Sequence, residues 1–159
     1  MNSKEEKQFE PADRDFKADS STCQVLRPIN QNLYSNISPA QLQQVSPSAL
    51  AYLGDAVYEL YIRMFYFLPP RRLESYHRLV VAQVKAETQA EIMRKLSPHL
   101  NAGELEIARR GRNAATGRTR RVDLVTYQQA TSLEALIGYL YLTDYQRLTE
   151  LLQKLQLKL

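Results

Sequence analysis

The chain has 159 residues, 44% of them hydrophobic, and a formal net charge of +4 at pH 7. It contains no glycine-rich or repetitive tract, so we expect one modest domain with a tail. No apolar run approaches the roughly 20 residues needed to span a bilayer, which argues against a membrane partner. Cys23 is the single cysteine, and with two histidines it excludes a disulfide framework and makes a zinc site improbable; a reducing cytoplasm is expected.

The first 36 residues are polar and carry five basic and six acidic side chains. Apolar residues are too sparse there to form a core, which predicts a disordered tail over 1–36 and a folded domain over 37–159. The acids argue against an organellar transit peptide. The excess positive charge therefore belongs to the domain, which has sixteen basic and eleven acidic residues.

Two helices are predicted at the start of the domain. Ser38 and Pro39 favour a short helix over 37–45, and Ser46 and Pro47 favour the start of a longer one that reaches Tyr66. Apolar residues of the longer helix recur at three- and four-residue spacing, which predicts a stripe facing the core. The stripe contains Ala49, Leu50, Leu53, Ala56, Val57, Leu60, Tyr61 and Met64.

Asp55 is a solitary acid in the middle of this apolar helix and lies off the predicted stripe. Its neighbours on the helix are mostly apolar or aromatic, so the carboxylate costs several kcal/mol of desolvation unless a cation, a metal or hydrogen bonds meet it. Gly54 stands beside it, where glycine costs roughly 1 kcal/mol relative to alanine and is usually tolerated for close backbone approach. Another element should pack tightly against this turn.

A third long helix is predicted over 73–96, ended by Ser97 and Pro98, and a short helix over 103–108. A basic loop over 109–121 follows, with six arginines, no acid and two glycines that keep it pliable. Arginine binds phosphate oxygens in bidentate fashion, so the loop predicts a nucleic-acid partner. The alternative is a solvated basic loop that neutralises nearby acids.

A helix over 123–142 repeats the earlier pattern, with Glu134 as the lone acid of its apolar half and Gly138 one turn further on. A final amphipathic helix is predicted over 143–157, and no segment is typical of a strand, so the fold should be all-α. Two helices that each carry a glycine beside an acid can cross closely enough for the acids to converge. Paired carboxylates repel unless they share a proton or bind a cation, and oxygen ligands suit Mg²⁺ or Mn²⁺. Alternatively, Asp55 and Glu134 each form an ion pair elsewhere.

Three motifs in this order resemble the ribonuclease III family. LGDAVYE over 53–59 and LEALIGYLYL over 133–142 are similar to its two metal-binding helices. RRGRNAATG over 109–117 resembles the Mini-III branch, which lacks a separate double-stranded-RNA-binding domain. The resemblance runs from about Ser46 to about Leu155. It implies a dimeric, ribonuclease III-type helical endonuclease domain in which Asp55 and Glu134 are catalytic and bind Mg²⁺, with Mn²⁺ as a substitute.

The resemblance also implies a substrate. It indicates an endoribonuclease that cleaves double-stranded regions of structured RNA, leaving 5′-phosphate and 3′-hydroxyl ends, with precursor 23S ribosomal RNA as the expected target. A ribosomal protein on the substrate is a further candidate partner. In the family the basic loop reaches into the duplex, so the expected RNA-binding residues are Arg109, Arg110, Arg112, Asn113, Arg118, Arg120 and Arg121.

Cleavage of both strands requires two sites, and a homodimer is expected to supply them. Tyr58, Ile62 and Phe65 are apolar residues left over once the predicted stripe fills the core, and they suggest a dimer surface on the central helix.

Two auxiliary residues are weaker candidates. Glu59 lies one turn after Asp55 and could support it, although Arg63 offers an ordinary helix ion pair. Lys85 occupies a position where Mini-III proteins also have lysine, so it could touch phosphate or orient a carboxylate, or simply extend into solvent.

The chain departs from full-length ribonuclease III enzymes at three positions. Ser48, Ala51 and Thr131 stand where those enzymes carry further acids. Fewer ligands remain for metal, a sparser set that the Mini-III branch shares.

Two other kinds of protein remain open. A non-catalytic double-stranded-RNA-binding module that assists ribosome assembly would keep the basic loop but would not require both acids. A purely protein-binding helical domain explains neither the loop nor the acids.

Overall fold

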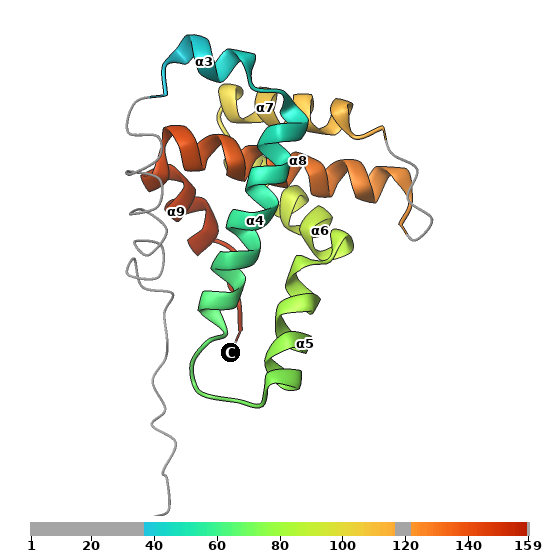
Figure 1. The fold of residues 1–159 in the computed structure, drawn as a ribbon. Helices are drawn as coiled ribbons and strands as arrows, with labels where there is room; N and C mark the ends of the chain where they lie inside the picture. Colours follow the sequence, from blue (N-terminus) through green and yellow to red (C-terminus); the bar gives the residue numbers. More distant parts are fainter. Residues whose placement is uncertain (1–36, 117–121, 159) are drawn as a thin grey trace, which may run out of the picture.

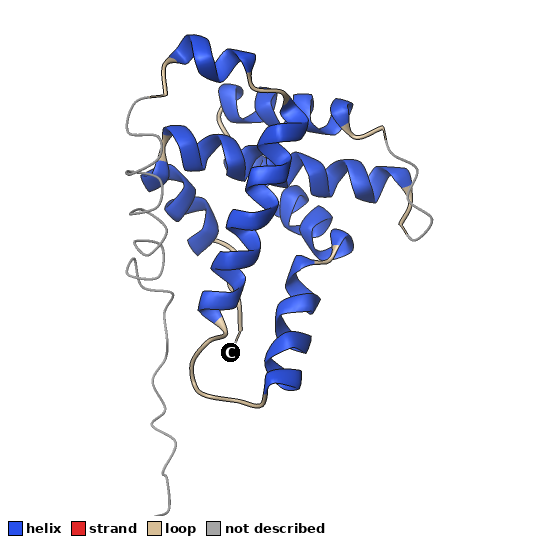
Figure 2. Cartoon of the chain, viewed as in Figure 1, coloured by secondary structure: helices blue, strands red, loops and turns tan. Residues whose placement is uncertain are grey.

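The computed structural model describes residues 37–116 and 122–158, and every regular element in these ranges is helical (Figures 1 and 2). This confirms the predicted all-α class. The predicted tail over 1–36 lies outside the described residues. No helix in the described ranges is long and apolar enough to cross a membrane. The elements are α3 (Pro39–Gln44), α4 (Pro47–Phe65), α5 (Leu73–Val84), α6 (Ala86–Leu96), the 3₁₀ turn η1 (Ser97–His99), α7 (Ala102–Ala114), α8 (Leu124–Thr143) and α9 (Tyr145–Gln153).

Side-chain caps fix where the helices begin. The Ser46 hydroxyl accepts a hydrogen bond from the Ala49 amide at 3.1 Å at the start of α4. Ser38 forms a reciprocal capping box at the start of α3, and Asp123 accepts the Thr126 amide at 3.0 Å at the start of α8. Each cap satisfies a backbone N–H that has no partner within its own helix. The predicted starts of α3 and α4 at Ser38 and Ser46 are confirmed.

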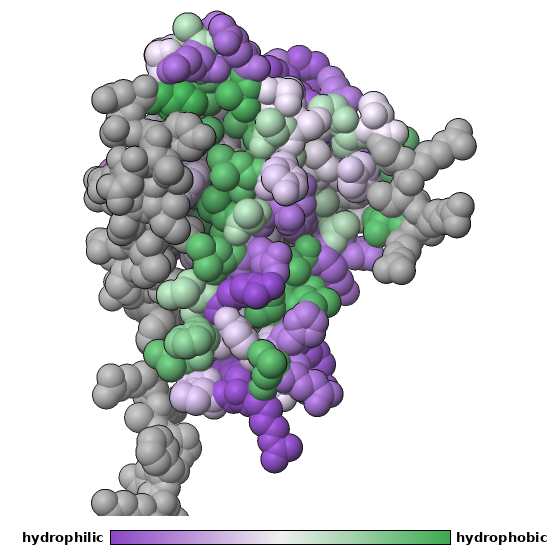
Figure 3. All heavy atoms as spheres, viewed as in Figure 1, coloured by the Kyte–Doolittle hydropathy of each residue, from purple (hydrophilic) through white to green (hydrophobic). Residues whose placement is uncertain are grey.

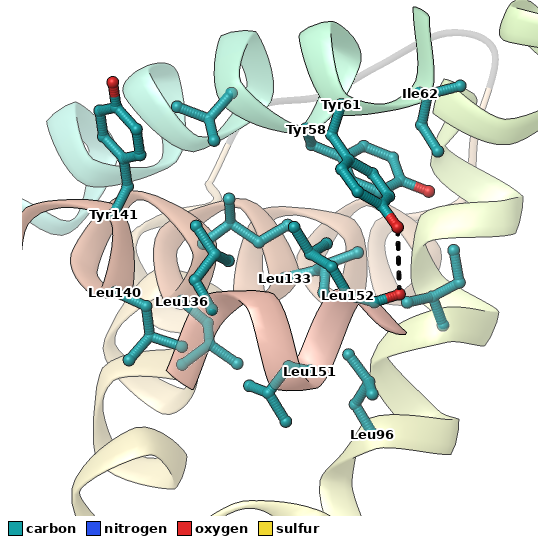
Figure 4. Packing of buried hydrophobic residues seen from close by; sticks show 14 of the residues in the cluster. Tyr58, Tyr61, Ile62, Leu96, Leu133, Leu136, Leu140, Tyr141, Leu151 and Leu152 are labelled. Atoms are coloured by element: carbon teal, nitrogen blue, oxygen red, sulfur yellow. Dashed lines mark hydrogen bonds between the residues drawn. The ribbon is translucent and has the colours of Figure 1, made fainter. Parts of the chain in front are cut away.

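Helix α8 is the centre of the fold. It packs against α4, α6, α7 and α9, and α4 crosses it (Figure 1). Its buried side chains, including Leu133, Leu136 and Leu140, meet those of α9 and α4 in the main hydrophobic core (Figure 4). The Tyr61 hydroxyl donates to the Leu152 carbonyl at 3.5 Å across this core. Because other helices cover α8 on several sides, much of its length has no face exposed to solvent.

The buried face of α4 is rotated from the predicted stripe. Leu60 and Ala56 are exposed, whereas Tyr58 and Ile62 are fully buried and Phe65 is 5% exposed. The helix packs against α8 and also against α5 and α7, so two of its sides are covered instead of one. The prediction that Tyr58, Ile62 and Phe65 form a dimer surface is therefore wrong, because the core of the single chain already buries them.

The predicted helix over 73–96 is two helices. Lys85 has extended backbone angles (φ −68°, ψ 150°) and separates α5 from α6. The Thr88 hydroxyl donates to the Ala82 carbonyl at 2.7 Å, which satisfies one of the acceptors that the break leaves open. The break allows α5 to follow α4 while α6 packs on α8.

The predicted loop over 109–121 begins too early. Helix α7 continues to Ala114, so Arg109, Arg110, Arg112 and Asn113 lie on its last turns. Gly111 is buried, and a Cβ added to it would lie 2.6 Å from the Ala135 Cβ on α8. This glycine therefore permits close helix packing and does not make a pliable loop.

A buried ion pair joins the starts of α7 and α9. The Arg147 guanidinium donates to both carboxylate oxygens of Glu104, at 2.7 and 3.0 Å, and to the His99 carbonyl at 2.7 Å. Glu104 also accepts the Asn101 amide at 2.9 Å and its side chain is 4% exposed. The hydrogen bond from Arg147 is the main cause that lowers the pKa of Glu104. Every contact of this carboxylate thus favours its ionised form.

Replacing Glu104 with Gln is expected to lower the free energy of unfolding by about 2 to 4 kcal/mol at pH 7, because Arg147 loses its buried bidentate partner and keeps only the more exposed Glu150 as an ion-pair partner. Since the folded pKa lies below 4.5, the stabilisation is present above that pH and is lost as the pH falls further. Urea unfolding followed by circular dichroism measures both effects. Glu106→Gln is the control, because it removes an exposed pair with Arg109 that contributes about 1 kcal/mol or less. Equal effects of the two variants would contradict this account.

Candidate active site

The site begins at the crossing of α4 and α8, where the two backbones touch. A Cβ added to Gly54 would lie 1.8 Å from the Glu134 carbonyl oxygen, and one added to Gly138 would lie 2.0 Å from the Leu50 carbonyl oxygen. No side chain fits at either point, so glycine is required for this approach. The close packing predicted from the two glycines is confirmed. It brings the turn of Asp55 against the turn of Glu134.

Glu134 is partly exposed at this crossing and its carboxylate is strongly perturbed. Burial, and secondly the negative charge of Asp55, raise its pKa from 4.5 to about 7. Desolvation and a neighbouring like charge both disfavour the ionised form. Since the charge of Asp55 acts on Glu134, the structure brings the two predicted acids together.

Asp55 is the more exposed of the two acids. Burial raises its pKa above the ordinary value, and the charge of Glu59 adds to the effect. Among the described residues neither Asp55 nor Glu134 lies within ion-pair distance of a lysine or arginine. The alternative in which each acid has its own cationic partner therefore finds no support in the described ranges.

Gln89 on α6 is the residue at this site that the sequence did not indicate. Its side chain is 1% exposed, and its amide approaches Glu134 closely enough to lower the carboxyl pKa slightly. The approach lacks the geometry of a formed hydrogen bond, and neither Nε2 nor Oε1 has another partner among the residues described. A glutamine in a polar stretch of helix gives no sequence signal of burial, because α8 covers it only in the folded chain.

The auxiliary candidates lie around the acids with different partners. Glu59 accepts hydrogen bonds from Arg63, as the four-residue spacing predicts, and remains near enough to affect Asp55. Lys85 is exposed at the break between α5 and α6, and no described contact joins its ammonium to either acid. The Thr131 hydroxyl donates to the Tyr127 carbonyl of its own helix at 3.0 Å.

The predicted RNA-binding arginines that the structure describes lie on α7, beside a surface groove of about 160 Å³ between α6, α7 and α8. Arg109 and Arg112 line this groove with Gln129 and Ser132, and neither acid does. Arg109 makes a bidentate pair with Glu106, with both distances at 2.7 Å, whereas Arg112 is exposed. Asn113 is also exposed and Arg110 is half-buried. The remaining predicted RNA-binding residues, Arg118, Arg120 and Arg121, lie outside the described residues.

The donor set at the crossing fits a divalent cation of the magnesium type. Asp55 and Glu134 offer oxygen ligands, and their mutual repulsion is relieved when a cation lies between them. Within the described ranges no cluster of three or more acidic, histidine or cysteine side chains exists. Two carboxylates are nevertheless sufficient for Mg²⁺, which is usually held by one or two carboxylates together with water and substrate phosphate.

Comparison with known proteins identifies the family of this domain. Residues 48–145 match the model of the ribonuclease III domain. The chain is 55% identical over 126 residues to the mini-ribonuclease 3 of Synechocystis sp., covering 77% of this chain and 88% of that protein. It is 42% identical over 106 residues to the mini-ribonuclease 3 of Desulfitobacterium hafniense, covering 66% and 68%. A crystal structure of a Fusobacterium nucleatum protein superposes with a TM-score of 0.62 at 30% identity, covering 69% of this chain and 93% of that one.

The fold and the family match thus define a helical endoribonuclease domain of the ribonuclease III type. Within that class, the chain belongs to the Mini-III branch of the ribonuclease III family.

Proposed function

We propose that the protein is a magnesium-dependent endoribonuclease that cleaves double-stranded regions of structured RNA and uses Asp55 and Glu134 to hold the cation. The observation that carries the proposal is the meeting of two acids where α4 and α8 cross, neither of which has a cationic partner among the residues that the structure describes. A fold built on glycines at that point places both acids on rigid helices and not on loops. Mn²⁺ should substitute for Mg²⁺, since both prefer oxygen ligands.

The cation and the two acids would have different roles in the reaction. A cation bound there supplies a Lewis acid that activates water and polarises the scissile phosphate. Glu134, whose pKa is about 7, must lose its proton to become a ligand, so it binds best above neutral pH. Asp55 is the more exposed acid and would offer the second carboxylate ligand. Hydrolysis in this manner yields 5′-phosphate and 3′-hydroxyl ends, as in the family.

Duplex RNA is the expected substrate because A-form helices are recognised by shape, phosphates and 2′-hydroxyls. The arginines of α7 offer the phosphate contacts. From the family we propose precursor 23S ribosomal RNA as the natural substrate, with a ribosomal protein on it as a possible aid, and the cytoplasm as the location.

Substituting Gln for both Arg110 and Arg112 is expected to weaken duplex binding across sequences and to lower the slope of log affinity against log salt by about one to two, because each phosphate contact contributes about 0.9. Fluorescence anisotropy at several salt concentrations in the presence of chelator measures this. Arg78→Gln, an exposed arginine on α5, is the control. An unchanged slope of log affinity against log salt would show that Arg110 and Arg112 of α7 do not contact the RNA.

A homodimer would supply the two sites that double-strand cleavage needs. The central core buries the residues first expected at the interface, but Tyr52 is 86% exposed on the face of α4 that also carries Asp55, and hydrophobic residues gather along α4 in Figure 3. Tyr52 with Ala56 and Leu60 is therefore the better candidate surface. Sedimentation equilibrium should give twice the chain mass of 18.3 kDa.

Incubation of the purified protein with duplex and single-stranded RNA of the same sequence tests the function. Cleavage of the duplex is expected with Mg²⁺ or Mn²⁺ and not with chelator. Binding without cleavage in every divalent metal would favour the alternative, a non-catalytic double-stranded-RNA-binding module for ribosome assembly.

A further inference from the structure

We propose that Gln89 is a positioning residue for Glu134, and that its amide holds the carboxylate in the orientation needed for the divalent cation. The inference rests on the proposed function, since it assigns Glu134 to that cation. The observation behind the inference is the buried side-chain amide of Gln89 beside the carboxylate of Glu134.

The burial of Gln89 requires an explanation. Its side chain is 1% exposed on α6, and among the described residues neither amide atom forms a hydrogen bond. An unpaired buried amide costs about 1 to 3 kcal/mol relative to a solvated one. An apolar side chain of the same size would fill this place at no such cost, because Ala90, Ile92 and Met93 on the same helix are buried and apolar.

The partner that the amide can reach is Glu134 on α8, the helix against which α6 packs. The amide N–H can donate to one carboxylate oxygen, and glutamine offers this donor without adding a charge. A carboxylate that binds a cation is ionised and is therefore a strong acceptor, since hydrogen bonds to charged groups are shorter and roughly twice as strong. The buried amide of Gln89 is thus matched to the form of Glu134 that would hold the cation.

This arrangement is typical of residues that orient a ligand and do not touch the metal. Donors to ligating carboxylates fix the ligand's rotamer, and their loss typically lowers metal affinity or activity by 10- to 100-fold, on the order of what we expect here. Lys85 lies four residues earlier, where it is exposed, and so offers no such fixed donor.

Replacing Gln89 with Leu tests the proposal, because Leu retains an apolar side chain of similar size and removes the amide. We expect Mn²⁺ affinity, measured by isothermal titration calorimetry without RNA, to fall about 10-fold. The midpoint of thermal unfolding without metal should stay equal or rise, and duplex binding in chelator should not change. A purely structural role predicts the reverse: lower stability and unchanged Mn²⁺ affinity.

Two further variants keep the test decisive. Gln89→Met, which is unbranched and adaptable, replaces the Leu variant should that one misfold. Ile92→Leu is the matched control on the same helix and should leave Mn²⁺ affinity unchanged. Wild-type Mn²⁺ affinity and cleavage rate in a folded Gln89 variant would overturn the inference alone. Wild-type protein that binds no Mn²⁺ and cleaves no duplex would instead overturn the proposed function, and the inference with it.

Discussion

Replacing Glu134 with Gln is expected to reduce duplex cleavage at least about 100-fold while leaving RNA binding in chelator intact, and Asp55→Asn should have the same effect. Each change keeps the shape of the side chain and removes one of the two charges that can hold a cation. Single-turnover cleavage at saturating protein, with Mg²⁺ varied, separates loss of metal binding from loss of chemistry. Glu91→Gln, an exposed acid on α6, is the control and should cleave as the wild type does.

The Glu134 variant has a second, opposite consequence for stability. The pKa of this acid rises from 4.5 to about 7 on folding, so stabilisation from the protonated form is complete below pH 4.5 and is lost as the pH rises through 7. Glutamine remains neutral, so at pH 8 the metal-free variant should be more stable than the wild type by roughly 2 kcal/mol, a figure that allows for partial exposure of the group. Activity and stability would then move in opposite directions. Equal stability at pH 8, together with undiminished cleavage, would contradict the account of this site.

Gly54→Ala and Gly138→Ala are each expected to lower the free energy of unfolding by about 3 to 5 kcal/mol or to prevent folding. The added Cβ would fall 1.8 Å or 2.0 Å from a backbone oxygen of the facing helix, and backbone cannot rotate away as a side chain can. In an uncrowded helix the same change stabilises by up to about 1 kcal/mol, so the sign itself is diagnostic. Urea unfolding followed by circular dichroism gives the values.

Gly103→Ala is the matched control for the glycine variants. Gly103 lies in the first turn of α7, where an added Cβ would meet Asn101 at an ordinary 3.4 Å. This variant should fold with wild-type or slightly greater stability. A wild-type unfolding midpoint for Gly54→Ala would show that α4 and α8 do not touch as described.

The parts of the site that sequence predicts are those where one residue contradicts its surroundings. Asp55 and Glu134 are acids in apolar helices, and each has a glycine that lowers helix propensity and so needs a packing reason. Capping residues such as Ser46 mark helix starts because they act within four residues of the chain.

The features that sequence missed depend on tertiary packing. The break at Lys85 contains no proline or glycine and arises where α5 and α6 pack on different partners. Gly111 resembles a loop residue until α8 is seen against it, and Gln89 resembles a surface residue until α8 covers it. The buried face of α4 is predicted wrongly because a helix that packs on two sides buries more than one stripe of residues. Tyr58 lies in the second of these stripes.

The contact of main chain with main chain at Gly54 and Gly138 bears on how such proteins diverge. The distance between the turns that carry Asp55 and Glu134 is set by the contact of helices α4 and α8 and not by the segments that connect these helices. Insertions or deletions in those segments, such as residues 66–72, can accumulate over evolution without changing that distance. Sequence changes are therefore expected to gather in the connecting segments, while the helix crossing itself stays constant.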